Sequence, residues 1–224
     1  MTIGEKFERL VEIMARLRSE TGCIWDRQQT HASLRQYLLE EAYEVLEAID
    51  QEGDNELSKE LGDLLLQAVF HAQIAKEEGR FDIAIVIENI SEKMIRRHPH
   101  VFGDEKINSV AEQKARWEEL KKLEGKQSPI DGVPKALPAL QRAARLQQKA
   151  NTPAMSWQQF QTTMAEFESA IVSSDGHASM AHQKKLHEAY GDLLFALVAA
   201  GRGLELNAED ALREACEKFI RTRR

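Results

Sequence analysis

The sequence predicts an all-α protein made of two tandem helical repeats. Nearly every long segment places apolar residues three or four positions apart, which is the spacing of one helix face. One such row is Phe7, Leu10, Val11, Met14 and Leu17. Another is Leu61, Leu64, Leu65, Ala68 and Val69. The alternating pattern of a strand is scarce, and proline and glycine gather mainly at 99–103, 125–138 and 153.

Three short stretches recur in the same order on the two sides of a segment rich in proline and glycine. The pairs are EVLEAI (44–49) with EFESAI (166–171), ELGDLLLQAV (60–69) with AYGDLLFALV (189–198), and EKMIRR (92–97) with EKFIRT (217–222). Helices made of Leu, Ala and Glu often look alike, but the shared order and the shared GDLL favour an internal duplication. The segment between them, EGKQSPIDGVPKALP (124–138), has the composition of a linker.

Composition limits the classes of function. The 224 residues are 42% hydrophobic and 30% charged, as in a soluble globular protein, and the net charge of −7 argues against a general nucleic-acid binder. Cys23 and Cys216 make neither a disulfide scaffold nor a zinc site, so a reducing compartment is expected. The N-terminus lacks the apolar core of a signal peptide, and the longest apolar run (193–201) is too short to span a bilayer. We therefore expect a cytoplasmic protein without membrane partners.

Acidic residues are concentrated on two neighbouring predicted helices. In LLEEAYEVLEAI (38–49), Glu41 and Glu44 are three apart and share a face, with Glu40 alongside Glu44. After a break at QEGDN (51–55), Glu60 and Asp63 repeat the spacing of three. All five side chains are therefore candidates for one site.

The two acidic stretches can meet if their helices run antiparallel. Gly53 would supply the turn, and Asp54 or Asn55 could cap the second helix. Glu44 lies about 13 Å of helix before the turn and Asp63 about 12 Å after it, at a rise of about 1.5 Å per residue. The acids would thus face each other at a similar height.

Two interpretations of these acids remain open. Carboxylates held close together repel unless cations neutralise them, and hard oxygen ligands suit Mg²⁺ or Mn²⁺. Alternatively, each row is an ordinary solvated helix face. Lys59 is the only lysine between 38 and 75, and no histidine of the chain follows an acid by three positions, which argues against a di-iron bundle.

Basic and aromatic residues offer possible contacts to a nucleotide. In EKMIRRHPHVFGD (92–104), Lys93 and Arg97 are one turn apart with Arg96 adjacent, which suits phosphate but also fits a basic helix end. The chain has neither a Walker A loop nor a G-x-G-x-x-G motif. Trp25, in GCIWDRQQTH (22–31), and Trp117 could stack on a base or simply anchor the core.

Three stretches together resemble the MazG family of nucleoside triphosphate pyrophosphohydrolases, in the all-α NTP pyrophosphatase group. They are GCIWDRQQTHASLRQYLLEEAYEVLEAI (22–49), KELGDLLLQAVFHAQIA (59–75) and IRRHPHVFGD (95–104). The family motif reads E-E-x-x-E, a spacer, then E-x-x-D, and here it is Glu40, Glu41, Glu44, Glu60 and Asp63. The resemblance implies a MazG-like repeat with the intact motif at 1–123, a linker at 124–138 and a second, degenerate repeat at 139–224.

The resemblance also implies an activity. It is the Mg²⁺-dependent hydrolysis of the bond between the α- and β-phosphates of an NTP or dNTP, which yields a nucleoside monophosphate and pyrophosphate. Mn²⁺ could replace Mg²⁺. The expected cellular role is housekeeping of nucleotide pools. The metal ligands would be Glu41, Glu44, Glu60 and Asp63. Glu40, or another of these acids that is not fully engaged, would orient or deprotonate the attacking water, and Lys93, Arg96 and Arg97 would hold phosphate. Family members are usually homodimers or higher homo-oligomers.

The second repeat departs from the family pattern. Thr162 and Thr163 stand where the first repeat has Glu40 and Glu41, and Ala189 stands where it has Glu60. Glu166 and Asp192 remain, so we expect weak metal binding there and a role in packing. The competing functional hypothesis is a non-catalytic helical module that binds a nucleotide or a partner protein and has kept only the scaffold.

Overall fold

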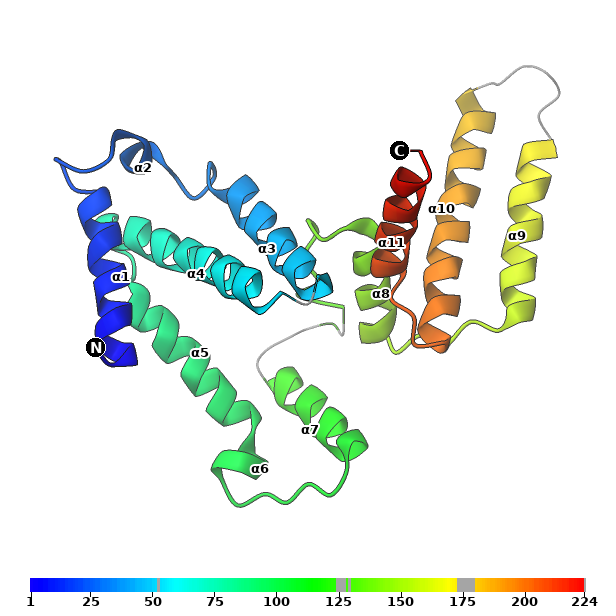
Figure 1. Ribbon diagram of the computed structural model, residues 1–224. Coiled ribbons are helices and arrows are strands. Elements are labelled where there is room, and N and C mark those ends of the chain that lie inside the picture. The colour runs from blue at the N-terminus through cyan, green and yellow to red at the C-terminus, as the bar shows by residue number, and fades with distance from the viewer. Residues whose placement is uncertain (52, 124–127, 129, 173–179, 224) are drawn as a thin grey trace. The chain divides into compact units, whose positions relative to one another are not determined.

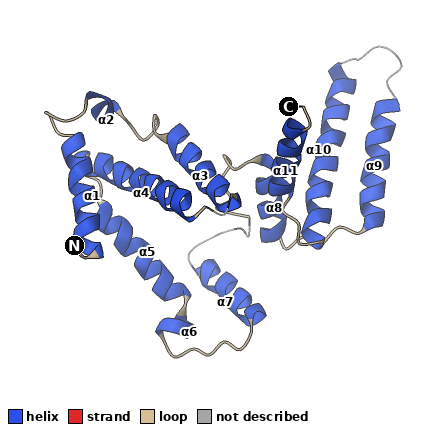
Figure 2. Cartoon of the chain, in the orientation of Figure 1, coloured by secondary structure: helices blue, strands red, loops and turns tan. Residues whose placement is uncertain are grey.

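The computed structural model describes residues 1–224 except 52, 124–127, 129, 173–179 and 224. Every regular element within these described ranges is a helix, which confirms the predicted all-α class (Figures 1 and 2). Five residues of the predicted linker, 124–127 and 129, lie outside the described residues. Across the described chain, we find no helix whose length and apolar character would allow it to cross a bilayer.

The chain divides into two compact units, Met1–Gln113 and Lys114–Arg224. The helices that begin in the first unit are α1 (Ile3–Leu17), α2 (Ile24–Gln28), α3 (Arg35–Asp50), α4 (Asp54–Glu77), α5 (Ile83–Arg97), α6 (Pro99–Phe102) and α7 (Val110–Leu123). The second unit holds α8 (Ala139–Lys149), α9 (Trp157–Val172), α10 (Met180–Gly203) and α11 (Ala208–Arg221). The division between the units falls inside α7.

The first unit is organised around α4, which packs against α1, α3 and α5. Its core consists of Met14 from α1, Leu34 just before α3, and Val69, Phe70 and Ile74 from α4. The remaining members of the predicted apolar row on α1 are partly buried against this core. The sequence therefore identified the correct face of α1.

The predicted apolar row on α4 is only partly buried. Val69 belongs to the core, but Leu61 and Leu65 are 49% and 43% exposed. All the buried residues of α4 lie between Gln67 and Ala75. The N-terminal half of this helix therefore carries apolar side chains that its own unit does not cover.

The turn between α3 and α4 is short, as predicted, but its capping differs from the expectation. Gly53 is the N-cap residue of α4, with φ of −100°, and no side chain caps this end. Asp54 and Asn55 already lie inside the helix, so neither can accept a bond as its cap. Asp54 still stabilises the start of this helix, because its negative charge lies in the first turn, at the positive end of the helix dipole.

The second unit is organised around α10, which packs against α8, α9 and α11. Helices α9 and α10 have 16 and 24 residues, the same lengths as α3 and α4. Gln147 of α8 is buried, and its Nε2 donates a 2.8 Å hydrogen bond to the carbonyl of Phe195 on α10. The equal lengths and the similar helix neighbours agree with an internal duplication, which remains a prediction.

Candidate metal centre

Three of the five predicted acids come together on the α3–α4 hairpin. Glu41 extends from α3, and Glu60 and Asp63 extend from α4. One carboxylate oxygen from each lies within 4.8 Å of the other two. Helix α3 ends at Asp50 and α4 begins at Asp54, and the two helices pack against each other. The acids of α3 therefore lie opposite the acids of α4.

Burial and mutual repulsion of the carboxylates determine the electrostatics of this group. Partial burial and then repulsion from Asp63 and Glu44 raise the pKa of Glu41. Partial burial, followed by repulsion from Glu44 and Asp63, likewise raises the pKa of Glu60. A bound cation or proton would relieve this repulsion.

The lysine closest in sequence does not supply that charge to the group. The Nζ of Lys59 pairs with the carboxylate of Glu56 at 2.7 Å, on the same helix. Both side chains of this pair are more than half exposed, so the contact is an ordinary surface ion pair.

The two other predicted acids take different positions. Glu44 is exposed and is not one of the three converging ligands among the described residues, but its carboxyl hydrogen-bonds to Glu60 and repels Glu41. Glu40 is exposed and also stands outside that group in the described chain. Because it precedes Glu41 directly, it is rotated by about 100° around the helix.

The three converging carboxylates fit a divalent cation. Mg²⁺ binds oxygen at about 2.1 Å, so its opposite ligands are about 4.2 Å apart. Oxygens within 4.8 Å of one another therefore need only small side-chain rotations to share one ion. An all-carboxylate set with neither thiolate nor imidazole suits Mg²⁺ or Mn²⁺ better than zinc.

A residue that the sequence analysis did not single out lies beside the group. Gln67 of α4 is 6% exposed, and its Nε2 donates a 3.4 Å hydrogen bond to Oε1 of Glu41. This bond lowers the pKa of Glu41, opposing burial and the neighbouring acids. The available signal was its position four residues after Asp63, on the same helix face.

Trp25 contacts Tyr37, a residue one helical turn before Glu41 on α3. Its segment, predicted as a loop, contains the short helix α2, and Trp25 is 48% exposed. The ring meets Tyr37 edge-on, with centroids 5.7 Å apart and planes at 75°. Tyr37 precedes Glu41 by four residues on α3, so Trp25 has one side against the hairpin and one side open.

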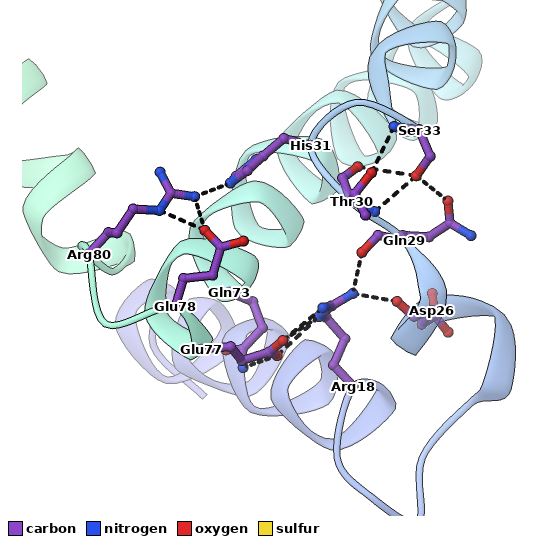
Figure 3. Close-up of polar contacts among 10 residues, drawn as sticks. All are labelled: Arg18, Asp26, Gln29, Thr30, His31, Ser33, Gln73, Glu77, Glu78 and Arg80. Carbon is purple, nitrogen blue, oxygen red and sulfur yellow. Dashed lines mark hydrogen bonds and ion pairs between the residues drawn. The ribbon is translucent and has the colours of Figure 1, made fainter.

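A buried arginine fastens this segment to the end of α4. Arg18, whose side chain is 7% exposed, donates from Nε and Nη2 to the carboxylate of Glu77, at 3.0 and 2.7 Å (Figure 3). Its Nη1 donates to the carbonyls of Asp26 and Gln29, the latter at 3.2 Å. The segment that carries Trp25 is thus anchored through one guanidinium.

Two histidines lie next to this anchor. The rings of His31 and His71 stack with centroids 5.0 Å apart, and their Nδ1 atoms are 2.7 Å apart. His31 also contacts Arg80 through Nε2, and Arg80 pairs with Glu78 (Figure 3). Burial, and then the charge of His31, lowers the pKa of His71, so His71 is neutral at pH 7.

The predicted phosphate-binding residues lie on the last turns of α5. Lys93 and Arg97 are partly buried and Arg96 is exposed. Trp117, the other candidate for base contact, is partly buried on α7 in the second unit. The roles of these four residues remain predictions.

The second unit lacks an equivalent group among its described residues. The hydroxyls of Thr162 and Thr163 donate to the carbonyls of Gln158 and Gln159, one turn earlier on their own helix. The two remaining acids of the degenerate motif, Glu166 on α9 and Asp192 on α10, are both exposed. In the described ranges, only Glu41, Glu60 and Asp63 form a group of three or more potential metal ligands.

Fold and site together define an all-α protein whose antiparallel hairpin presents carboxylates suited to a divalent cation. Residues 29–102, which contain the whole hairpin, match the MazG nucleotide pyrophosphohydrolase domain. With the relatives described next, this match shows that the chain belongs to the MazG family.

The relatives align with nearly the whole chain. The nucleoside triphosphate pyrophosphohydrolase/pyrophosphatase MazG of Thermotoga maritima is 44% identical over 220 residues, which are 97% of this chain and 84% of that protein. The nucleoside triphosphate pyrophosphohydrolase of Escherichia coli K12 is 44% identical over 223 residues, or 96% and 85%. The crystal structure of a mazG-related protein from Thermotoga maritima is 35% identical and covers 51% of this chain and 98% of its own, with a TM-score of 0.45.

Proposed function

We propose that this protein is an enzyme that hydrolyses nucleoside triphosphates to monophosphates and pyrophosphate, using Mg²⁺ or, in its place, Mn²⁺. The observation that carries the proposal is the convergence of Glu41, Glu60 and Asp63 within 4.8 Å. Membership of the family and the names of the relatives support the same reaction. The polyphosphate of the substrate needs the positive charge that these acids would hold.

Each acid has a distinct task in this proposal. Glu41, Glu60 and Asp63 bind the metal, with Glu44 as a further ligand on the side of Glu60. A bound Mg²⁺ would neutralise phosphate charge and lower the pKa of a water molecule. Glu40, on the neighbouring face of α3, orients that water or takes its proton.

The remaining parts of the substrate fall to residues outside the hairpin. Lys93, Arg96 and Arg97 would stabilise the charge that develops on the departing pyrophosphate, because guanidinium and ammonium groups match phosphate oxygens. Trp25 offers an exposed ring for base stacking beside Tyr37, with Trp117 as a second candidate. The contacts of these aromatic residues would determine which base the enzyme prefers.

We further propose that the chain is a tandem duplication whose second copy no longer binds metal tightly. The equal lengths of α9 and α10 to α3 and α4 support the duplication. Thr162 and Thr163 offer no carboxylate, and their hydroxyls bond to carbonyls of their own helix. The second copy would then serve packing and assembly.

The enzyme would act as a homodimer or larger homo-oligomer in the housekeeping of cytoplasmic nucleotide pools. The exposed apolar residues of the hairpin support self-association, because a second copy would remove them from water. They are Leu38, Leu39, Tyr43, Leu46, Ile49, Leu61 and Leu65. Light scattering on the purified protein would give the assembly size directly.

The alternative function is a non-catalytic module that binds a nucleotide or a partner protein. The degenerate second copy is the feature that favours it. A pyrophosphate-release assay with a panel of NTPs and dNTPs and Mg²⁺ separates the two functions. We expect wild-type protein and Glu166→Gln to release pyrophosphate, and Glu41→Gln to release none. Equal losses in the two variants would refute the assignment of the active site to the first copy.

A further inference from the structure

Gln67 continues the acidic row of α4 into the core. It follows Asp63 by four residues and Glu60 by seven, so all three share one face of the helix. Glu60 is partly buried and Asp63 is exposed, whereas Gln67 is only 6% exposed. The carboxylates thus have solvent on one side and a buried amide on the other.

The only hydrogen bond of the Gln67 side chain in the described structure is the one to Glu41. Its Nε2 donates to Oε1 of Glu41 at 3.4 Å, and its own Oε1 is buried without a partner among the described residues. The opposite orientation of the amide would set two acceptor oxygens against each other. Glu41 therefore fixes which end of the buried amide faces the acidic group.

We propose that Gln67 is a positioning residue of the metal centre, which holds the Glu41 carboxylate in the orientation needed to bind a divalent cation. The inference rests on the proposed function, because it takes Glu41, Glu60 and Asp63 as metal ligands. It adds a residue that binds neither metal nor substrate and acts through Glu41 alone.

The physical basis is that a ligating carboxylate needs a fixed orientation. Glu41 lies among Glu44, Glu60 and Asp63, whose repulsion favours rotation of its carboxylate away from the group. The N–H of Gln67 opposes this rotation, because it binds one of the two carboxylate oxygens. Partners of this kind behind metal ligands typically account for 10- to 100-fold in metal affinity. At 3.4 Å the bond is long, so we expect an effect of about tenfold.

A second glutamine on α4 provides a matched control. Gln73 donates from Nε2 to the carboxylate of Glu77 at 2.8 Å, which is also an amide-to-carboxylate bond. It lies outside the acidic group, at the opposite end of the helix. A general loss of α4 stability would affect both variants, whereas a positioning role affects metal binding only in the Gln67 variant.

The test is a Mn²⁺ titration of the full chain without nucleotide, followed by electron paramagnetic resonance of the free ion. We expect Gln67→Met, which keeps the side-chain size but removes the donor, to bind Mn²⁺ about tenfold more weakly than wild type. Gln73→Met should bind as wild type does. Gln67→Asn, which is one methylene too short to reach Glu41, should also bind Mn²⁺ weakly. It replaces Gln67→Met in the comparison if the Met variant does not fold.

Raising Mn²⁺ tenfold should restore pyrophosphate release by the Gln67 variants, because only metal affinity has changed. Wild-type affinity in a folded Gln67 variant, or an equal loss in Gln73→Met, would overturn the inference. A wild-type protein that binds no Mn²⁺ would instead contradict the proposed metal site, so the two failures are distinguishable.

Discussion

Glu41→Gln should stabilise the metal-free protein while it removes metal binding. In the folded protein the carboxylate of Glu41 lies within 4.8 Å of that of Asp63. Two unit charges at 4.8 Å repel by about 0.9 kcal/mol in water and about 3.5 kcal/mol at an effective dielectric constant of 20. Because Asp63 is exposed, we expect a value near the lower limit, about 1 kcal/mol, which is roughly 2–4 °C in Tm.

The sign follows from the raised pKa of Glu41, whose largest cause is burial. A carboxyl whose folded-state pKa is raised binds its proton more tightly in the folded protein, so its stabilising effect is lost as the pH rises through that pKa. The neutral glutamine avoids this loss. The advantage of Glu41→Gln should therefore be present at pH 7 and should disappear below the ordinary carboxyl pKa, where Glu41 is protonated in both states.

When metal is bound, the wild type should be more stable than Glu41→Gln. At a hundred times its Kd, a bound ion stabilises the wild type by about 2.7 kcal/mol, whereas the variant gains little. The assay is thermal unfolding in EDTA and then in rising MnCl₂ at pH 7, with Glu166→Gln as the exposed control in the second unit. A Glu41→Gln protein that is no more stable in EDTA and that keeps the full Mn²⁺ shift would refute the reasoning.

Three further changes test other parts of the first unit. Arg18→Met removes the cationic partner of the partly exposed Glu77 and leaves it only the bond from Gln73, so thermal unfolding should show a loss of about 2 kcal/mol. Lys59→Met, at an exposed pair, should have little effect. Burial and a neighbouring imidazole lower the pKa of His71, so the stability that the neutral ring contributes to the folded state is lost as the pH falls below about 6.5. In His71→Asn, the free energy of unfolding should therefore fall less between about pH 7 and 5. Lys93→Met should reduce kcat/KM for pyrophosphate release about tenfold or more, with Mn²⁺ affinity unchanged when nucleotide is absent.

The α3–α4 hairpin was largely predictable from the sequence. Apolar period, a glycine-containing break and two acid pairs of spacing three are local signals, and they specify two helices with acids on facing sides. The pairing of Glu41 with Asp63, and of Glu44 with Glu60, then follows from the antiparallel turn. Local patterns were sufficient because all of these residues lie on one hairpin.

Contacts between segments that are distant in the sequence could not be predicted from local patterns. The anchor of Arg18 on Glu77 joins residues 59 positions apart, and neither side chain stands out from the charged residues around it. Gln67 sits in the apolar run LLLQAVF, and its spacing from Asp63 places it on the acidic face, but no local pattern shows that its amide reaches Glu41 on the other helix. The exposed Leu61 and Leu65 follow the same apolar period as the buried Val69, because periodicity does not say how far along a helix its partners extend.

The most direct test of the proposed metal centre is a crystal structure with Mn²⁺ and a non-hydrolysable nucleoside triphosphate, in which anomalous scattering locates the ion. The proposal predicts a Mn²⁺ peak bound by oxygens of Glu41, Glu60 and Asp63 and in contact with the phosphates. A triphosphate bound elsewhere in the chain, with these three carboxylates in water and no ion between them, would contradict it.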